Sequence, residues 1–352
     1  MDNFRKEIDS IDTEILDLIA RRIDCAREIG KIKAAKGEEI YVPSREKIVF
    51  ENILRKNGGR VSETAVRAIF REIISAAISA EQKLTVSYLG PKATFTNQAA
   101  IKNFGSSVDY VPAPSIPDVF TAVEAGEADY GVIPIENSTE GAVSHSIDML
   151  AETGLTIVGQ IYMSIEHCLL SRGTIDSIKK ICSKDQAISQ CRGWIHRNMS
   201  ADVQLEPVDS TTTAVKMAAQ DPEIAAIASE VSADCYGVPV LRRAIQDQKD
   251  NQTRFLVIGK TPNKKTEGVK YRTSIVVSIN DRPGALGEVI SPFEKAGINL
   301  LRIESRPSHK KAWDYFFFID FDGHWSDENV KEVAAHLKYS LPMVKWLGSY
   351  PK

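Results

Sequence analysis

Two polar segments in the middle of the chain adjoin apolar runs and carry side chains that bind small polar ligands. Asp250–Arg254 leads directly into the apolar run Phe255–Ile258, which ends at Gly259. Glu136–Gly141 follows a second apolar run, Tyr130–Ile135. Apolar runs of this length predict core strands, so the hydroxyls, amides and guanidinium would stand at strand ends on a rigid support. The pattern predicts a site where hydrogen-bond donors meet a ligand.

Two further polar segments open predicted helices. Gly90–Thr96 follows a predicted strand and presents hydroxyls and N–H groups suited to a carboxylate. Ser210–Thr213 opens another helix, and N-capping explains only one of its four hydroxyls. Taken singly, Gly90–Thr96 and Glu136–Gly141 are also compatible with ordinary turns. Together the segments predict a pocket at the carboxyl ends of strands, where open α/β sheets bind ligands.

The N-terminal segment carries cations within an apolar heptad pattern. Residues at spacings of 3 and 4 are mostly apolar over 1–36, but Arg22 occupies one of these positions. Its guanidinium either reaches water past an apolar stem or pairs with an anion. Lys33 shares the face of Arg22, close to three turns further on. Arg5 lies about 25 Å away along the same helix, so only a second chain could bring an Arg5 to that site.

Bulk properties exclude several classes of protein. The chain has 352 residues and a net charge of −3, which indicate two or three domains and give no support for a nucleic-acid or membrane partner. No apolar run approaches the roughly 18 residues of a membrane span, and the N-terminus is unlike a secretory signal. Five scattered cysteines favour a reduced cytoplasmic protein. The six histidines form no metal-binding pattern, so we expect neither a metal site nor a cofactor.

The predicted elements change type twice along the chain. Residues 1–36, Ser44–Lys56 with Ser44 as N-cap, and Ser62–Lys83 read as three helices. The first would be about 54 Å long, too long for a compact monomer of 83 residues, which predicts an intertwined dimer. From Leu84, strands alternate with helices, as in α/β domains, and a cleft between two lobes is expected. The predicted strands are 84–88, 130–135, 156–163, 167–171, 180–183, 225–228 and 255–258, and the helices are 96–103, 115–124, 147–152, 185–197, 211–220 and 230–236.

The last part of the chain follows a polar linker at Thr261–Gly268. Its predicted order is strand, helix, strand, strand, helix, strand, which fits a ferredoxin-like βαββαβ unit. The corresponding ranges are 273–280, 286–296, 299–306, 313–321, 327–337 and 343–349.

These motifs carry a family resemblance. Asn251–Gly259, taken with Pro134–Gly141, closely resembles the signature of prephenate dehydratases, and the flanking segments resemble a chorismate mutase and an amino-acid-sensing ACT domain. The order is similar to that of the bifunctional enzymes of phenylalanine biosynthesis. The resemblance implies an all-α three-helix chorismate mutase domain that forms an intertwined dimer, a two-lobed α/β prephenate dehydratase domain similar to periplasmic binding proteins, and a ferredoxin-like ACT domain. The expected boundaries are 1–83, 84–260, a linker at 261–270, and 271–352.

The same resemblance implies the reactions and the ligands. Chorismate would rearrange to prephenate, and prephenate would lose water and CO2 to give phenylpyruvate, with phenylalanine as inhibitor. The rearrangement needs no acid or base, only a folded conformer and charge stabilisation at the breaking ether oxygen. The implied mutase residues are Arg5 from the partner chain and Arg22 on the carboxylates, Lys33 and Glu81 on the ether oxygen, Arg45 as organiser and Glu46 on the hydroxyl.

Three positions depart from the commonest pattern. Glu81 stands where Gln is usual, and a Glu donates a hydrogen bond only when protonated. Mutase activity should therefore fall as pH rises, and fall less in Glu81→Gln. Alternatively, Glu81 is an exposed residue of a terminal helical turn. Val42 and Ala77 replace Asp and Ser of some relatives but remove no principal charge.

For the dehydratase, Thr253 is the residue expected to assist departure of the ring hydroxyl, and Thr253→Ala should reduce turnover at least a hundredfold. Arg254 would anchor the side-chain carboxylate of prephenate or, alternatively, form a structural ion pair. The other implied pocket residues are Thr94, Thr96, Asn137, Ser138, Ser183, Gln190, Thr211 and Thr212.

Two segments resemble the phenylalanine-binding parts of ACT domains: Asp281–Leu286 and Gly297–Pro307. The implied effector residues are Gly284, Ala285, Leu286, Glu304, Ser305, Arg306 and Pro307. An ACT unit that only dimerises is the alternative. Two alternatives remain for the whole chain: a dehydratase whose helical segment merely dimerises it, and a two-lobed protein that binds an anion without chemistry.

Overall fold

The computed structural model describes residues 1–280, 282–307 and 315–352. The helical segment comprises α1 (Asp2–Lys36), α2 (Pro43–Asn57) and α3 (Glu63–Glu81). Ser62 caps α3 by accepting a hydrogen bond from the Ala65 N–H, as expected. Ser44 is not the N-cap of α2, because the helix already begins at Pro43, and the Ser44 hydroxyl instead accepts a hydrogen bond from Thr266. The three predicted helices are confirmed.

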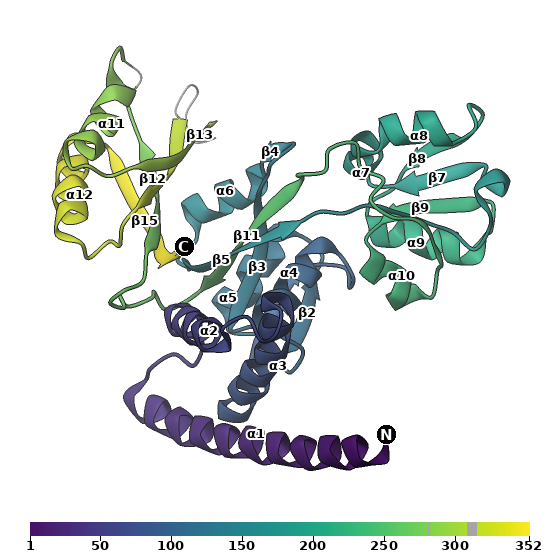
Figure 1. The fold of residues 1–352 in the computed structure, drawn as a ribbon. Coiled ribbons are helices and arrows are strands. Elements are labelled where there is room, and N and C mark those ends of the chain that lie inside the picture. The colour runs from purple at the N-terminus through teal and green to yellow at the C-terminus, as the bar shows by residue number, and fades with distance from the viewer. Residues whose placement is uncertain (281, 308–314) are drawn as a thin grey trace.

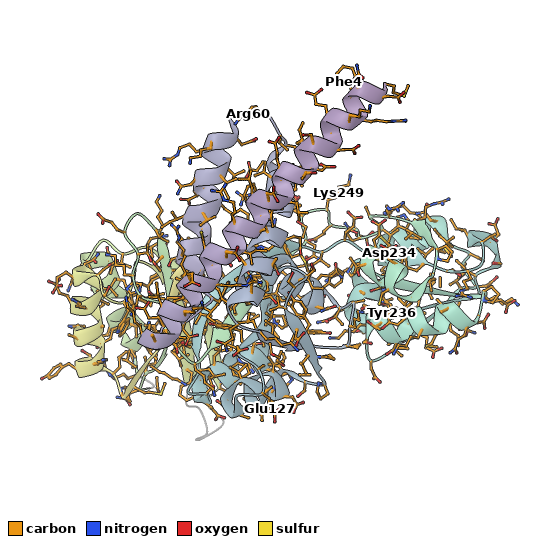
Figure 2. The ribbon with its side chains drawn as sticks, turned by 90° about the horizontal axis from the view of Figure 1, so that it is seen from below. Phe4, Arg60, Glu127, Asp234, Tyr236 and Lys249 are labelled. Atoms are coloured by element: carbon orange, nitrogen blue, oxygen red, sulfur yellow. The ribbon has the colours of Figure 1, made fainter. Side chains whose placement is uncertain are left out.

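The first helix extends away from the rest of the chain. Figure 1 shows α1 running along the bottom of the molecule, and Figure 2 shows Phe4 near its free end. Its only buried residues are Ala26 and Gly30, where it packs against α3. The apolar seam of α1 lies in solvent, with about half or more of each side chain exposed at Ile8, Ile11, Ile15 and Leu18.

The central sheet has the strand order β2-β1-β3-β11-β5, with β4 paired to β3. In β11, Gln252 to Arg254 already pair with β5 as part of the strand. The expectation that the polar cluster precedes the strand is therefore wrong, and its side chains alternate between the two faces of the sheet. The elements are β1 (Thr85–Leu89), α4 (Phe95–Phe104), β2 (Asp109–Ala113), α5 (Ile116–Ala125), β3 (Tyr130–Asn137), β4 (Gly141–Ala142), α6 (Ser144–Glu152), β5 (Thr156–Ser164) and β11 (Gln252–Gly259).

A second sheet, of order β10-β6-β9-β7-β8, forms the other lobe at the right of Figure 1. The chain passes between the lobes twice, after β5 and before β11, and the two passages are hydrogen-bonded to each other at Ile245 N to His167 O, 2.9 Å. The predicted two-lobed α/β architecture is confirmed. The elements are β6 (Cys168–Leu170), η1 (Ile175–Ser177), β7 (Lys180–Ser183), α7 (Asp185–Gln190), α8 (Arg192–Asn198), β8 (Gln204–Pro207), α9 (Thr211–Gln220), β9 (Ile224–Ala228), α10 (Glu230–Tyr236) and β10 (Val240–Arg242).

The C-terminal unit is a four-stranded antiparallel sheet of order β13-β14-β12-β15, the predicted ferredoxin-like arrangement. Its helices pack together on one face, on the left of Figure 1. Residues 281 and 308–314, which include parts of the predicted effector segment and of the predicted strand 313–321, lie outside the described residues. The elements are β12 (Tyr271–Ser278), α11 (Ala285–Lys295), β13 (Leu300–Pro307), β14 (Tyr315–Asp322), α12 (Glu328–Ser340) and β15 (Met343–Pro351).

The three parts share hydrophobic cores on the two faces of the central sheet. On one face, Phe50 and Ile74 of the helical segment pack in a single cluster with Phe255 and Val257 of β11. On the other face, Phe318 and Leu347 of the C-terminal sheet share a cluster with Leu256. Burial of apolar area across these contacts fixes the helical segment and the C-terminal sheet against the same central strand. Among the described helices, none is both long and apolar enough to cross a membrane.

Candidate active sites

The packing of α1 against α3 gathers the predicted mutase residues of one chain. Lys33 Nζ donates to Glu81 Oε2 at 3.2 Å, with both side chains at most one-fifth exposed. Gly30 allows this approach, because a Cβ there would stand 3.0 Å from Cβ of Glu81. Arg22 donates to the Ile73 carbonyl at 3.4 Å. Burial lowers the pKa of Arg22, the charge of Glu81 opposes that effect, and the nearby charge of Arg45 adds to it.

Glu46 lies beside this cluster but is bound to a residue that the sequence did not single out. Arg71 donates to Glu46 Oε2 at 2.9 Å and stands over the ring of Phe50. Burial raises the pKa of Glu46, although the Arg71 guanidinium acts against it. Glu46 Oε1 is buried and has no hydrogen-bond partner in the described part of the chain, so this oxygen can accept from a ligand hydroxyl. No motif distinguishes Arg71 in the sequence.

Arg5 does not join this cluster within one chain. It lies one turn into the exposed end of α1, where it forms an ion pair with Asp2 at 3.8 Å. The separation from Arg22 is about 25 Å along the helix. This placement agrees with the geometric argument that a site containing Arg5 takes it from another chain.

The connection between α1 and α2 holds Lys33 and is anchored in the neighbouring domain. Lys33 Nζ donates to the Ile40 carbonyl at 2.9 Å. On one side of Ile40, Tyr130 donates to Glu39 Oε2 at 3.0 Å. On the other side, the buried Tyr41 ring packs 5.2 Å from that of Tyr130. The position of Lys33 therefore depends on residues of the central sheet.

The dehydratase candidates Thr253 and Asn137 face each other on neighbouring strands. They pair in register between β11 and β3, and Asn137 Nδ2 donates to Thr253 Oγ1 at 2.8 Å. Asn137 Oδ1 accepts from the backbone N–H groups of Thr139 and Glu140, at 2.9 and 3.2 Å, which fixes the orientation of its amide. Thr253 thus accepts a hydrogen bond from protein, and its own O–H hydrogen remains free to donate.

A chain of amides extends this pair to the second lobe. Asn137 Nδ2 also donates to Asn251 Oδ1 at 2.7 Å, and Asn251 Nδ2 donates to Gln190 Oε1 at 3.0 Å. His167 Nε2 lies 2.9 Å from the same Gln190 oxygen. Because that oxygen can only accept, His167 donates through Nε2, which leaves its buried Nδ1 without a partner. Asn251 lies in the motif Asn251–Gly259, whereas no sequence motif contains His167.

The remaining dehydratase candidates lie at helix starts and strand ends of the two lobes, where most of them bond to backbone groups. Thr94 caps α4 and donates to the Leu89 carbonyl at 3.1 Å, and Thr212 at the start of α9 donates across the lobes to the Lys92 carbonyl at 3.2 Å. Ser183 is fully buried and bound to the Ile227 carbonyl. Ser138 accepts from the Gln252 N–H at 2.9 Å. Thr96 is buried in the first turn of α4, and Thr211 is the first residue of α9.

The structure does not place Arg254 with this group. It follows Thr253 on β11 and points to the opposite face, where its guanidinium binds Asp320 at 2.5 Å and the Tyr350 hydroxyl at 2.6 Å. Only 2 % of its surface is exposed. In this arrangement Arg254 forms a buried ion pair with the C-terminal sheet and does not reach the hydroxyl and amide cluster.

The candidate effector residues lie at one end of the C-terminal sheet. Gly284, Ala285 and Leu286 line a cavity of about 250 Å³ together with Tyr315 and Phe317. Ser305 and Pro307 of β13 pair with Phe317 and Tyr315, so the second predicted segment is the strand next to the one that lines this cavity. Glu304 and Arg306 lie on the same strand, where Arg306 forms an ion pair with Asp148 of α6 at 3.1 Å. Among the described residues, β13 is an edge strand of this sheet, with no strand paired to its outer side.

Comparisons with known proteins find three successive matches along the chain. The chain matches chorismate mutase type II over residues 4–82, prephenate dehydratase over 86–263 and the ACT domain over 273–334. It is 48% identical to the bifunctional chorismate mutase/prephenate dehydratase of Aquifex aeolicus, over 99% of this chain and 97% of that protein. The corresponding protein of Pseudomonas aeruginosa is 41% identical, over 99% and 96%. A solved prephenate dehydratase from Arthrobacter aurescens, in complex with L-Phe, is 34% identical with a TM-score of 0.69, over 76% of this chain and 90% of that one.

A helical site rich in cations and a two-lobed site lined with hydroxyls and amides, joined to an ACT domain, define a multifunctional enzyme acting on small anions. The chain belongs to the family of bifunctional chorismate mutase/prephenate dehydratases. It is both an isomerase and a carbon–oxygen lyase of phenylalanine biosynthesis.

Proposed function

We propose that chorismate rearranges at a site built from two chains. One chain supplies Arg22, Lys33, Arg45, Glu46 and Glu81, and the other supplies Arg5. The observation that supports this is the exposed apolar seam of α1, together with the distance of Arg5 from the cluster. A second α1 laid along the seam would cover it and bring Arg5 of the partner chain to the cluster.

Within that site the residues act by position and charge. Arg22 and Arg5 hold the two carboxylates, and Lys33 donates to the ether oxygen that breaks away. Glu81 is bound to Lys33 and is the second residue beside the same oxygen, and Oε1 of Glu46 accepts from the substrate hydroxyl.

Subunit complementation tests the shared site. Chains carrying Arg5→Ala and chains carrying Lys33→Ala are each expected to lack mutase activity. In co-expressed chains, half of the dimers are mixed and each mixed dimer has one intact site, so about a quarter of the wild-type rate should return. If mixing restores no activity while each variant remains dimeric, Arg5 does not act across the interface.

For the dehydratase we propose that Thr253 donates a hydrogen bond to the ring hydroxyl as it leaves. The C–CO2 bond breaks, its electron pair completes the aromatic ring, and the C–O bond to the hydroxyl breaks, so the products are phenylpyruvate, CO2 and, after proton uptake, water. Threonine is a poor acid, but aromatisation makes the elimination strongly downhill, and a hydrogen bond in a desolvated cleft suffices. The donation from Asn137 to Thr253 supports the proposal, because it leaves the Thr253 hydrogen for the substrate.

Because Arg254 points to the opposite face of the sheet, other groups must bind the carboxylates of prephenate. We propose the N-termini of α4 and α9, which belong to different lobes and are joined by the hydrogen bond from Thr212 to the Lys92 carbonyl. Their free N–H groups and hydroxyls favour an anion.

We expect phenylalanine to bind between Gly284–Leu286 and Glu304–Pro307 and to inhibit the dehydratase, as its binding to the Arthrobacter aurescens dehydratase suggests. A homodimer or higher homo-oligomer in the cytoplasm completes the proposal.

The first experiment follows both products from chorismate, with and without phenylalanine. Prephenate should appear before phenylpyruvate, and phenylalanine should suppress the second product. If the chain consumes added prephenate but not chorismate, the helical segment only dimerises it. If it consumes neither, a binding protein without chemistry is the better description.

A further inference from the structure

The strands that carry the catalytic pair also carry an ion pair on their opposite face. In the register of β3 with β11, Asn137 lies opposite Thr253, and Glu136 lies opposite Arg254. Asn137 and Thr253 bind each other on one face, and Glu136 Oε1 binds Arg254 Nη1 at 3.3 Å on the other. Asn137 is therefore the chain neighbour of Glu136, and Thr253 is the chain neighbour of Arg254.

A β-bulge makes this arrangement possible. Thr253 and Arg254 pair with Asn137 and Glu136, but Phe255 pairs with Pro134, so Ile135 is an extra residue without a partner on β11. An extra residue reverses the alternation of the strand beyond it and re-aims its side chains. The last two residues of β3 therefore owe the directions of their side chains to this bulge.

Glu136 connects Arg254 to the candidate effector strand. Its second oxygen, Oε2, accepts from Arg302 Nε on β13 at 3.0 Å. Arg302 also lies 3.6 Å from Glu304, two residues further along β13 and the first of the candidate effector residues on that strand. The side chain of Arg302 is 11% exposed, and its guanidinium stands over the ring of Phe318. Arg254 itself is fixed to Asp320 of β14 and to Tyr350 of β15.

The network has unused hydrogen-bonding capacity. Arg254 Nε and Arg302 Nη1 are buried and make no hydrogen bond to any of the described residues. When some buried donors of a network lack hydrogen-bond partners, the same charged groups can adopt a second arrangement. An effector shifts the equilibrium between two such arrangements if it binds one of them more tightly than the other.

We infer that Glu136 and Arg254 are positioning residues that place Asn137 and Thr253, and that the Arg302–Glu136 ion pair makes this placement depend on the state of β13. The inference deepens the proposed function and rests on it. The ammonium group of an amino acid bound at β13 competes with Arg302 for the Glu304 carboxylate. Arg302 then pairs more strongly with Glu136, which weakens the ion pair between Glu136 and Arg254. The resulting shift of Glu136 moves the Asn137 amide away from Thr253.

The test uses the full chain with Glu136→Gln, which keeps the size of the side chain and removes its charge. Dehydratase kcat, KM and the phenylalanine concentration for half inhibition are measured together, and phenylalanine binding is measured separately by calorimetry. We expect kcat to fall several-fold with little change in KM. The half-inhibitory concentration should rise at least about fivefold, the lower range of typical coupling between sites, while phenylalanine still binds. Arg302→Met is the second variant, and it should raise the half-inhibitory concentration in the same way.

Asp148→Asn is the matched control. It removes the Arg306–Asp148 ion pair, which also joins β13 to the dehydratase domain but does not involve Glu136. Half inhibition at the wild-type phenylalanine concentration in both Glu136→Gln and Arg302→Met would overturn the inference, as would an equal shift in Asp148→Asn. A wild-type chain that converts prephenate and is insensitive to phenylalanine would instead refute the proposed regulation. The kcat of Glu136→Gln would then still decide the positioning role.

Discussion

Asn137→Asp tests the chemistry of the cleft most directly. The substitution preserves shape but removes the amide hydrogens, so position 137 can no longer donate to Thr253 Oγ1 across the present 2.8 Å. Thr253 would then donate its hydrogen to the new carboxylate, because hydrogen bonds to charged groups are the stronger ones. The substrate would lose one transition-state donor. Such a loss raises a barrier by about 3–4 kcal/mol, or on the order of 10²- to 10³-fold in kcat.

The assay is phenylpyruvate formation from prephenate, with mutase turnover and thermal unfolding as controls for folding. Asn251→Asp is the matched variant, because it retains an oxygen that can accept from Asn137 Nδ2 and so leaves Thr253 oriented. We expect it to lose less than about tenfold, as for one ordinary hydrogen bond. If folded Asn137→Asp keeps a third or more of wild-type kcat, the orientation argument fails. Equal losses in the two variants would assign the effect to added charge.

Four further predictions follow from the sites. Thr253→Ala should reduce dehydratase turnover at least a hundredfold and leave the mutase rate unchanged; full retained activity would remove Thr253 from the mechanism. Glu81→Gln should not lower mutase turnover, because the side-chain amide of Gln can donate a hydrogen bond to the ether oxygen; a loss of tenfold or more would remove position 81 as a donor to that oxygen. Burial lowers the pKa of His167, although its bond to Gln190 opposes this, so the unfolded chain takes up the proton first. The free energy of unfolding should therefore decrease as pH falls below about 6.5, and the urea midpoint should change less with pH in His167→Gln. Tyr130→Phe removes the bond to Glu39 that anchors the α1–α2 connection, and should lower mutase kcat about tenfold with the dehydratase intact; a fall in both rates would indicate general damage.

Local patterns in the sequence determined most of the secondary structure. The heptad spacing of α1, the Ser62 cap of α3 and the strand–helix alternation after Leu84 all depend on neighbours within a few residues. The spacing of Arg22 and Lys33 placed both cations on one helical face, and the motif carrying Thr253 marked the strand that holds it. The strands β2, β4, β8 and β10 were not predicted, because β2 and β8 are largely exposed and β4 and β10 are very short.

Only the tertiary structure decided which residues meet. Arg254 looked like part of a polar cluster before a strand, but backbone pairing begins at Gln252 with β5 and at Thr253 with β3, and it turns Arg254 to the opposite face. Its partner Asp320 lies 66 residues further along the chain. The bulge at Ile135 and the dependence of Lys33 on the central sheet likewise arise from packing between distant segments. Residue types and short-range spacing therefore determined the chemistry that is available, whereas strand register and shared cores decided which groups act together.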